Sequence, residues 1–318
     1  MAASPSPPRS AWVVCGACVR GASHERAGLP NQDAIATWVP PPGAENDPVI
    51  VAIADGHGGA RHFRSAIGAR FTVDTTVELL RSLATRIEAA SDAERSRIAA
   101  VDVPAGIVGA WNERVRSHLA STPITAAEWA GVEATEGRAA LDAVRADPML
   151  AYGTTALAAM VTGCCVVLAQ LGDGDILAVA PDGTTTRPLP ADERLLGNRT
   201  TSICRPGSER DFRCIAVAAG RVPLSLLLLS SDGYANSFQT DEDFLLVGRD
   251  LQEMIRSDGV AAVGAQLQGV LEHTSANGSG DDITLGLLLR TGGLGPQRGA
   301  HTDSETWGDA VEPPAIGS

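Results

Sequence analysis

The order of strand-like and helix-like segments is the feature of this sequence that most limits its fold. Short apolar runs typical of buried strands occur in three groups, and segments with helical periodicity separate the groups. The expected strands are 12–20, 33–39, 49–54, 154–162, 165–171, 176–180, 222–229 and 283–290. The expected helices are 59–83, 92–100, 107–119, 241–257 and 260–273, and 121–147 is expected to mix helix with loop. This order predicts an α+β fold in which helices cover two antiparallel sheets.

The connections refine this expectation. The three strands between 154 and 180 follow one another closely, with Gly- and Asp-containing turns between them, which predicts an antiparallel meander. Residues 21–30 form a polar connection, and residues 188–213 are polar and irregular. No internal repeat and no long linker is visible, so 11–290 is expected to be one domain between a disordered N-terminus (1–10) and a disordered tail (291–318).

Composition narrows the classes of function. The formal net charge of −13 argues against a nucleic-acid partner. No apolar run approaches the roughly 20 residues that a membrane span needs, and the Pro- and Ser-rich start has no apolar segment of a signal peptide. We therefore expect a cytoplasmic protein without a membrane partner. Cys15 and Cys18 have the C-x-x-C spacing, but no second pair completes a zinc site, so reduced core thiols are expected.

The hexapeptide 54–59, Ala-Asp-Gly-His-Gly-Gly, joins a buried strand to a helical pattern. Its glycines allow a tight bend and the close approach of a carbonyl to a ligand. The carboxylate of Asp55 and the imidazole of His57 are then expected at the end of a sheet. The alternative is a plain turn, because Asp-Gly is common turn chemistry.

Several other aspartates share the placement of Asp55 at the end of an apolar strand. They are Asp33, Asp173, Asp232, Asp281 and Asp282. A carboxylate there is costly unless it is hydrogen-bonded or binds a cation. If these positions converge, they form an oxygen-rich site that suits Mg²⁺ or Mn²⁺. Each aspartate alone could equally be a cap or turn residue, so the joint pattern carries the prediction.

The ordered motifs carry a family resemblance. They are 31–33 (Asn-Gln-Asp), 54–59, 153–156 (Gly-Thr-Thr-Ala), 171–175 (Leu-Gly-Asp-Gly-Asp), 231–233 (Ser-Asp-Gly) and 280–284 (Gly-Asp-Asp-Ile-Thr). Their order and spacing resemble the metal-dependent (PPM-type, type-2C) serine/threonine protein phosphatases over about 11–290. Ser23-His24 and the stretch 197–202 are similar to elements of the bacterial branch.

The resemblance implies an αββα sandwich with a two-metal site at one end of the sheets. It implies that Asp55 bridges both ions, that the Gly56 carbonyl binds one, and that Asp232 and Asp281 bind the other. Asp33 would act through metal-bound water, Asp173 would serve a weaker third ion, and His57 would be the general acid for the leaving alcohol. Two ions sharing a carboxylate generate a nucleophile near neutral pH and stabilise an in-line displacement. The alternative for His57 is a turn histidine bonded to backbone.

The chain departs from the family pattern at four positions. Asp282 stands where Asn is more usual, a change that is expected to be tolerated. Gln32 stands where many members have Glu, which removes a negative charge near the second ion. Gly28 stands where many members have a phosphate-binding Arg; His24 and Arg26 are the candidates to replace it, unless both are solvent-exposed loop residues. Asn236 replaces an acidic residue, which weakens the expectation of a third ion.

The resulting hypothesis is metal-dependent hydrolysis of phosphoserine and phosphothreonine in a phosphorylated protein substrate, with a cognate serine/threonine kinase as a further partner. One alternative is a non-catalytic phosphatase-fold protein that binds a phosphoprotein or kinase. Another is a small-molecule phosphoesterase that uses the same site with different loops. The segment 188–213 is the candidate flap beside that site.

Overall fold

The computed structural model describes residues 12–41, 44, 47–195 and 200–290. Ten strands form two five-stranded antiparallel sheets in this part of the chain, with the orders β1-β10-β9-β6-β7 and β2-β3-β4-β5-β8. The first sheet contains β1 (Trp12–Val19), β6 (Asp175–Val179), β7 (Thr185–Thr186), β9 (Leu226–Ser230) and β10 (Ile283–Arg290). The second contains β2 (Ala34–Trp38), β3 (Val49–Ala54), β4 (Ala156–Val161), β5 (Cys165–Leu171) and β8 (Arg213–Ala218).

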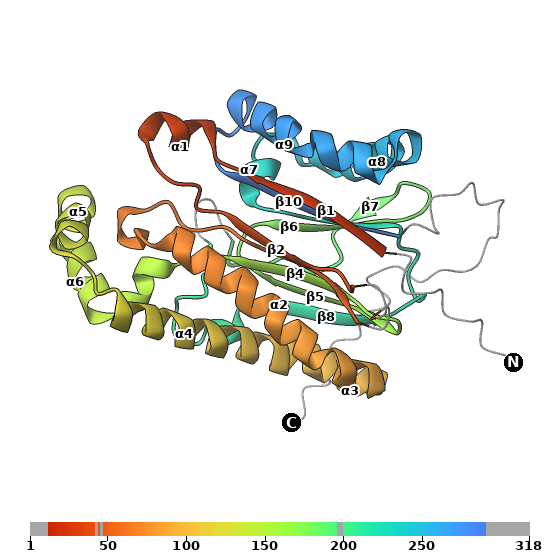
Figure 1. Cartoon of the computed structure of the whole chain (residues 1–318), viewed down its shortest axis with the longest axis horizontal. Coiled ribbons are helices and arrows are strands. Elements are labelled where there is room, and N and C mark those ends of the chain that lie inside the picture. Colours follow the sequence, from red (N-terminus) through yellow and green to blue (C-terminus); the bar gives the residue numbers. More distant parts are fainter. Residues whose placement is uncertain (1–11, 42–43, 45–46, 196–199, 291–318) are drawn as a thin grey trace, which may run out of the picture.

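Helices cover the outer face of each sheet, which confirms the predicted αββα sandwich (Figure 1). α8 (Asp241–Asp258) and α9 (Val260–Asn277) pack on the first sheet. α2 (Ser65–Ala89) and α4 (Val103–Ser121) pack on the second. The smaller helices are α1 (Ala22–Ala27), α3 (Asp92–Arg97), α5 (Ala126–Glu136), α6 (Arg138–Ala146) and α7 (Asp232–Ala235). No helix in the described residues is long and apolar enough to cross a membrane.

Alternate residues of each central strand enter different apolar layers. In β3, Ile50, Ala52 and Ala54 face α2, whereas the side chains between them face the other sheet. In β9, Leu226 and Leu228 face α8 and α9, whereas Leu227 and Leu229 face the second sheet. The strands are therefore buried on both faces, which explains why they read as continuous apolar runs.

Two sequence predictions for the connections are wrong. The segment 154–180 is not a meander, because β5 pairs with β4 and β8 while β6 joins the other sheet beside β9. The chain changes sheets at Gly172, whose φ of 100° favours glycine. Residues 21–30 are not only a connection, because α1 lies there. None of the residues of α1 is buried, so the segment has no apolar periodicity to reveal it.

Other boundaries also differ from expectation. The helix predicted to start at 59 begins at Ser65, after a 3₁₀ turn at Ala60–His62. The strand expected at 222–229 is β9, which begins at Leu226, and β7, β8 and α7 were not predicted. The segment expected to mix helix with loop holds α5 and α6. The predictions of disorder for 1–10 and 291–318, and residues 197–199 of the bacterial-type stretch, lie outside the described residues.

Candidate active site

The ends of strands from both sheets meet at one edge of the sandwich, and this places the predicted carboxylates together. Asp33 precedes β2 and Asp55 follows β3, its neighbour in the second sheet. Asp232 follows β9, and Asp281 and Asp282 precede β10, its neighbour in the first sheet. A cavity of about 510 Å³ opens between these strand ends. Its lining includes His24, Gln32, Asp55, Gly56, His57, Arg61, His62, Asp173, Thr200, Ser202, Arg205, Asp232, Asp281 and Asp282.

The Gly-Thr-Thr turn at 153–155 holds the backbone of Asp55. The hydroxyl of Thr154 and the N–H of Thr155 both donate to the carbonyl of Asp55, at 2.7 and 2.8 Å. The N–H of Asp55 donates to the hydroxyl of Thr155 at 3.0 Å, and the N–H of His57 donates to the carbonyl of Gly153 at 3.1 Å. These bonds leave the side chains of Asp55 and His57 free to face the cavity.

Gly56 must be glycine for the turn to pack. A Cβ at this position would lie 2.7 Å from the carbonyl oxygen of Gln32 and 2.9 Å from the backbone of Ser65. The N–H of Gly56 donates to that same carbonyl of Gln32 at 3.1 Å. The hexapeptide is therefore fixed against the segment that carries Asp33.

The carboxylates influence one another strongly. Burial raises the pKa of Asp55 well above its usual value, and the negative charges of Asp33, Asp232 and Asp281 raise it further. Burial also raises the pKa of Asp33 to about 8. The pKa values of Asp173 and Asp281 are raised by burial and by the charge of Asp232. Such convergence of acidic groups destabilises their charged forms unless a cation is bound.

The donor set fits a hard divalent cation. Every predicted ligand at the cavity offers oxygen, which Mg²⁺ and Mn²⁺ prefer. Two buried oxygens, Oε1 of Gln32 and Oδ2 of Asp33, have no hydrogen-bond partner among the described residues. Gln32 anchors its amide nitrogen to the hydroxyl of Ser65 at 2.9 Å, which leaves its oxygen available to the cavity. Unpaired buried oxygens beside repelling carboxylates are groups that a bound cation would satisfy.

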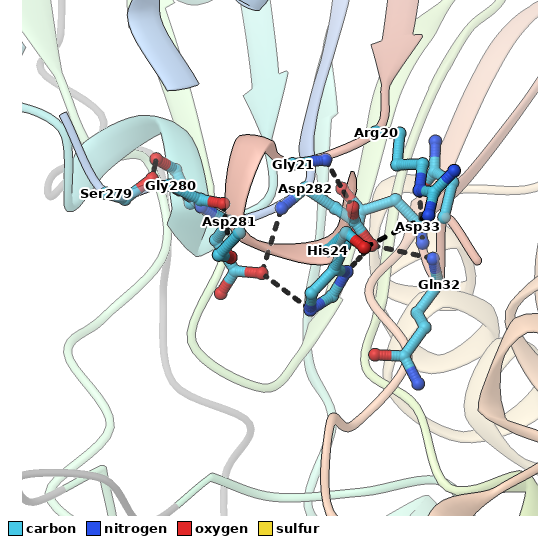
Figure 2. A network of polar contacts seen from close by, with 12 residues as sticks. Arg20, Gly21, His24, Gln32, Asp33, Ser279, Gly280, Asp281 and Asp282 are labelled. Carbon is cyan, nitrogen blue, oxygen red and sulfur yellow. Dashed lines mark hydrogen bonds and ion pairs between the residues drawn. The ribbon is translucent and has the colours of Figure 1, made fainter. Parts of the chain in front are cut away.

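Figure 2 shows a polar network that fixes the turn before β10. Asp282 is 3% exposed and accepts hydrogen bonds from the N–H groups of Gly21 at 2.6 Å and Gln32 at 2.7 Å. Nδ1 of His24 lies 2.9 Å from Oδ2 of Asp282, and Nε2 of His24 lies 3.7 Å from Oδ1 of Asp281. An asparagine at 282 has one side-chain acceptor oxygen instead of two, so the carboxylate suits these contacts.

The two predicted phosphate-binding residues have different surroundings. His24 lines the cavity, but its ring faces Asp281 and Asp282, and with them forms a group whose ligand atoms lie within 4.8 Å of one another. Arg26 is exposed on α1 and is not part of the cavity lining. The structure therefore brings His24 into the carboxylate cluster and leaves Arg26 outside the cavity.

His57 lies in the cavity next to a second histidine that sequence reasoning did not single out. The rings of His57 and His62 meet edge to face, with centroids 5.0 Å apart. Burial lowers the pKa of His57 to about 3, and the positive charges of His62 and Arg205 add to this effect. In the absence of an anionic ligand, His57 is thus neutral at pH 7.

Two further sequence expectations concern the edge of the cavity: the candidate flap 188–213 and Asn236. Residues Thr200, Ser202 and Arg205 line the cavity, so the described end of the candidate flap lies beside the site. Asn236 donates through its amide to Oδ2 of Asp232 at 3.0 Å. It supports this carboxylate but adds no charge near Asp173.

The raised carboxylate pKa values predict a pH effect on metal binding. Folding favours the protonated form of Asp33, so its contribution to stability is complete below about pH 3.8 and is lost as the pH rises toward 8. A cation reverses this preference and displaces protons. We expect Mn²⁺ binding at pH 7 to release protons, and its affinity to increase between pH 6 and 8. Calorimetric titration in two buffers of different ionisation enthalpy measures the release; identical heats in both would contradict it.

Comparisons with known proteins agree with this fold. The family model described as protein phosphatase 2C matches residues 20–272. A substituted form of a bacterial serine phosphatase superposes with a TM-score of 0.51 at 16% identity, covering 87% of this chain and 97% of that one. The serine/threonine phosphatase Stp1 from Staphylococcus aureus gives 0.52 at 16% identity, covering 87% and 94%.

A C. elegans sex-determining protein gives a TM-score of 0.51 at 19% identity, covering 89% of this chain and 65% of that one. At these identities the solved structures establish a shared fold. The search of curated protein sequences finds no match.

Proposed function

The chain belongs to the protein phosphatase 2C family, and we propose that it hydrolyses phosphoserine and phosphothreonine in proteins. The family is metal-dependent, and its phosphatase members act on phosphoproteins. The observation that carries the proposal is the convergence of Asp55, Asp232 and Asp281 with His57 on one cavity. We further propose that 11–290 is one catalytic domain, because the site takes residues from both sheets.

In the proposed assignment, Asp55 would be a ligand common to two ions, the carbonyl of Gly56 would be a ligand of one, and Asp232 and Asp281 would be ligands of the other. Asp33 and Asp173 are further oxygen donors at the same edge. Divalent cations held there, Mn²⁺ or Mg²⁺, would activate water and neutralise charge on the phosphate group. The mutual elevation of carboxylate pKa values supports this assignment, because it indicates acidic groups held close together.

His57 is assigned the transfer of a proton to the leaving oxygen of serine or threonine, which is a poor leaving group as an alkoxide. Its backbone is held by Gly153, and its ring lies at the cavity wall beside His62. The negative charge of a bound phosphate favours the protonated imidazole and so opposes the burial that lowers its pKa. Phosphorylated protein substrates, and a cognate kinase that makes them, are the partners of this activity.

The test is hydrolysis of p-nitrophenyl phosphate by the purified chain. We expect turnover with Mn²⁺, loss of turnover with EDTA, and recovery when Mn²⁺ is added in excess. The chemical reason is that hydrolysis of a phosphate monoester is among the slowest uncatalysed reactions and needs charge neutralisation. Absence of Mn²⁺-dependent turnover, combined with binding of a phosphopeptide, would instead favour the non-catalytic alternative.

A further inference from the structure

A phosphatase cavity of this kind needs a cation on the protein for the phosphate oxygens that face away from the metal ligands. Arginine suits this task because its planar guanidinium donates two parallel hydrogen bonds to a phosphate. Position 28, where the family resemblance expects that arginine, holds Gly28 in a left-handed conformation at the end of α1. A Cβ built on Gly28 would meet nothing within 4 Å, so no neighbouring group fills the space that an arginine side chain at this position would leave from.

Two of the basic side chains that line the cavity, Arg61 and His24, already have acidic partners. Nε of Arg61 lies 2.5 Å from Oε2 of Glu136, and the backbone N–H of Arg61 donates to Oε1 of the same carboxylate. His24 faces Asp281 and Asp282. The guanidinium of Arg205 differs, because it forms no ion pair or hydrogen bond with any described residue. Among the described residues, Arg205 is thus the arginine of this cavity that remains available to an anion.

The backbone around Arg205 is fixed. The N–H of Arg205 donates to the carbonyl of Ser202 at 3.2 Å, and its carbonyl accepts from the N–H of Ser208 at 3.1 Å. The start of this turn is tied to Thr154, whose carbonyl accepts the N–H of Ile203 at 3.0 Å and the hydroxyl of Ser202 at 3.3 Å. Arg205 therefore extends from a closed turn rather than from an unsupported loop.

The same threonine connects this turn to the carboxylate centre. Thr154 donates its hydroxyl to the carbonyl of Asp55 at 2.7 Å while its own carbonyl holds the turn of Arg205. Arg205 also lines the same cavity as His57 and His62. One short hydrogen-bonded path thus fixes the arginine relative to Asp55 and His57.

We propose that Arg205 binds the phosphate group of the substrate and supplies the cation that position 28 lacks. This inference rests on the proposed phosphatase function, because it assigns a phosphate ligand to the same cavity. The guanidinium would donate to two oxygens of a phosphate bound in this cavity. Because Arg205 is exposed at the cavity rim, it can reach the ligand without losing a partner of its own.

The test compares Arg205→Ala and Arg205→Lys with wild type, and uses Arg210→Ala as a matched control. Arg210 is an exposed arginine of the same segment that does not line the cavity. Two quantities are measured on the Mn²⁺-loaded chain: the Kd of inorganic phosphate by calorimetry, and KM and kcat for a phosphothreonine peptide. Because the loss of a charge-assisted contact is being measured, we expect Arg205→Ala to weaken phosphate binding and raise KM by about ten- to a hundredfold.

We expect Arg205→Lys to recover part of the affinity, because it keeps the charge but not the paired donors. Mn²⁺ affinity and the behaviour of Arg210→Ala should match wild type. A Kd for phosphate that is unchanged in Arg205→Ala would overturn the inference, even if the chain proves to be a phosphatase. Phosphate binding that depends on Arg205 in a chain without turnover would uphold the inference and refute the proposed function. Absence of phosphate binding in wild type would overturn the inference.

Discussion

Asp55→Asn is expected to abolish metal-dependent turnover, lowering kcat/KM by about 10³-fold or more, because the proposed shared ligand loses its charge. The change is nearly isosteric. The four hydrogen bonds that hold this turn use the backbone of Asp55 and His57, so they survive the substitution. The loss of activity should therefore arise from the missing carboxylate and not from a displaced turn.

The same substitution is expected to raise the stability of the metal-free protein and to reduce the additional stabilisation that Mn²⁺ provides. Asp55 is repelled by Asp33, Asp232 and Asp281, so removing its charge should raise the Tm of the metal-free protein. The stabilisation by Mn²⁺ seen for wild type should shrink, because a ligand stabilises only in proportion to its affinity for the folded state. Thermal unfolding with and without Mn²⁺, beside kcat/KM, measures both effects.

Asp258→Asn, at the exposed C-terminal end of α8, is the matched control and should resemble wild type in both measurements. If Asp55→Asn kept Mn²⁺-dependent turnover near the wild-type rate, the assignment of Asp55 as the shared ligand would be wrong.

Gly68→Ala is expected to cause the largest loss of stability, about 3 kcal/mol or more. Gly68 is buried where α2 crosses the turn before β4, and a Cβ there would lie 2.0 Å from the carbonyl oxygen of Tyr152. Backbone cannot rotate away as a flexible side chain can. The carbonyl of Gly68 also accepts from Nε1 of the buried Trp111 at 3.1 Å, so a shift of α2 disturbs a second contact.

Gly109→Ala provides the control, because Gly109 is an exposed glycine of α4 whose added Cβ would meet nothing within 4 Å. Helix propensity predicts that this change stabilises the fold by up to about 1 kcal/mol. Urea denaturation of both variants measures the difference. If the urea midpoint of Gly68→Ala equalled that of wild type, the close contact between α2 and the carbonyl of Tyr152 would be contradicted.

The sequence predicted the layers of the fold well because the elements have strong apolar patterns. It could not assign the strands to sheets. β5 and β6 are both apolar on two faces, so neither shows the alternation that would identify a partner, and the crossing at Gly172 went unseen. β8 was missed because it is an edge strand that follows a polar segment and has four of its six residues only partly buried. α1 was missed because it buries no residue.

The carboxylates of the site were predictable because each lies at a strand end, and antiparallel neighbours bring such ends to one edge. The partners of His24 were not predictable, since they depend on how α1 packs against the turn before β10. Arg205 was also hidden, because its place in the cavity depends on the hydrogen bonds of Thr154 to a distant loop. No local pattern encodes such a contact.

The most direct test of the central proposal is the rate of phosphate release from a phosphothreonine peptide, measured for wild type and Asp232→Ala in Mn²⁺. Circular dichroism of both proteins confirms that each is folded. The proposed two-sheet carboxylate site predicts Mn²⁺-dependent release by wild type and release at the background rate by Asp232→Ala. Equal release by the two proteins, or no dependence on Mn²⁺ in wild type, would contradict it.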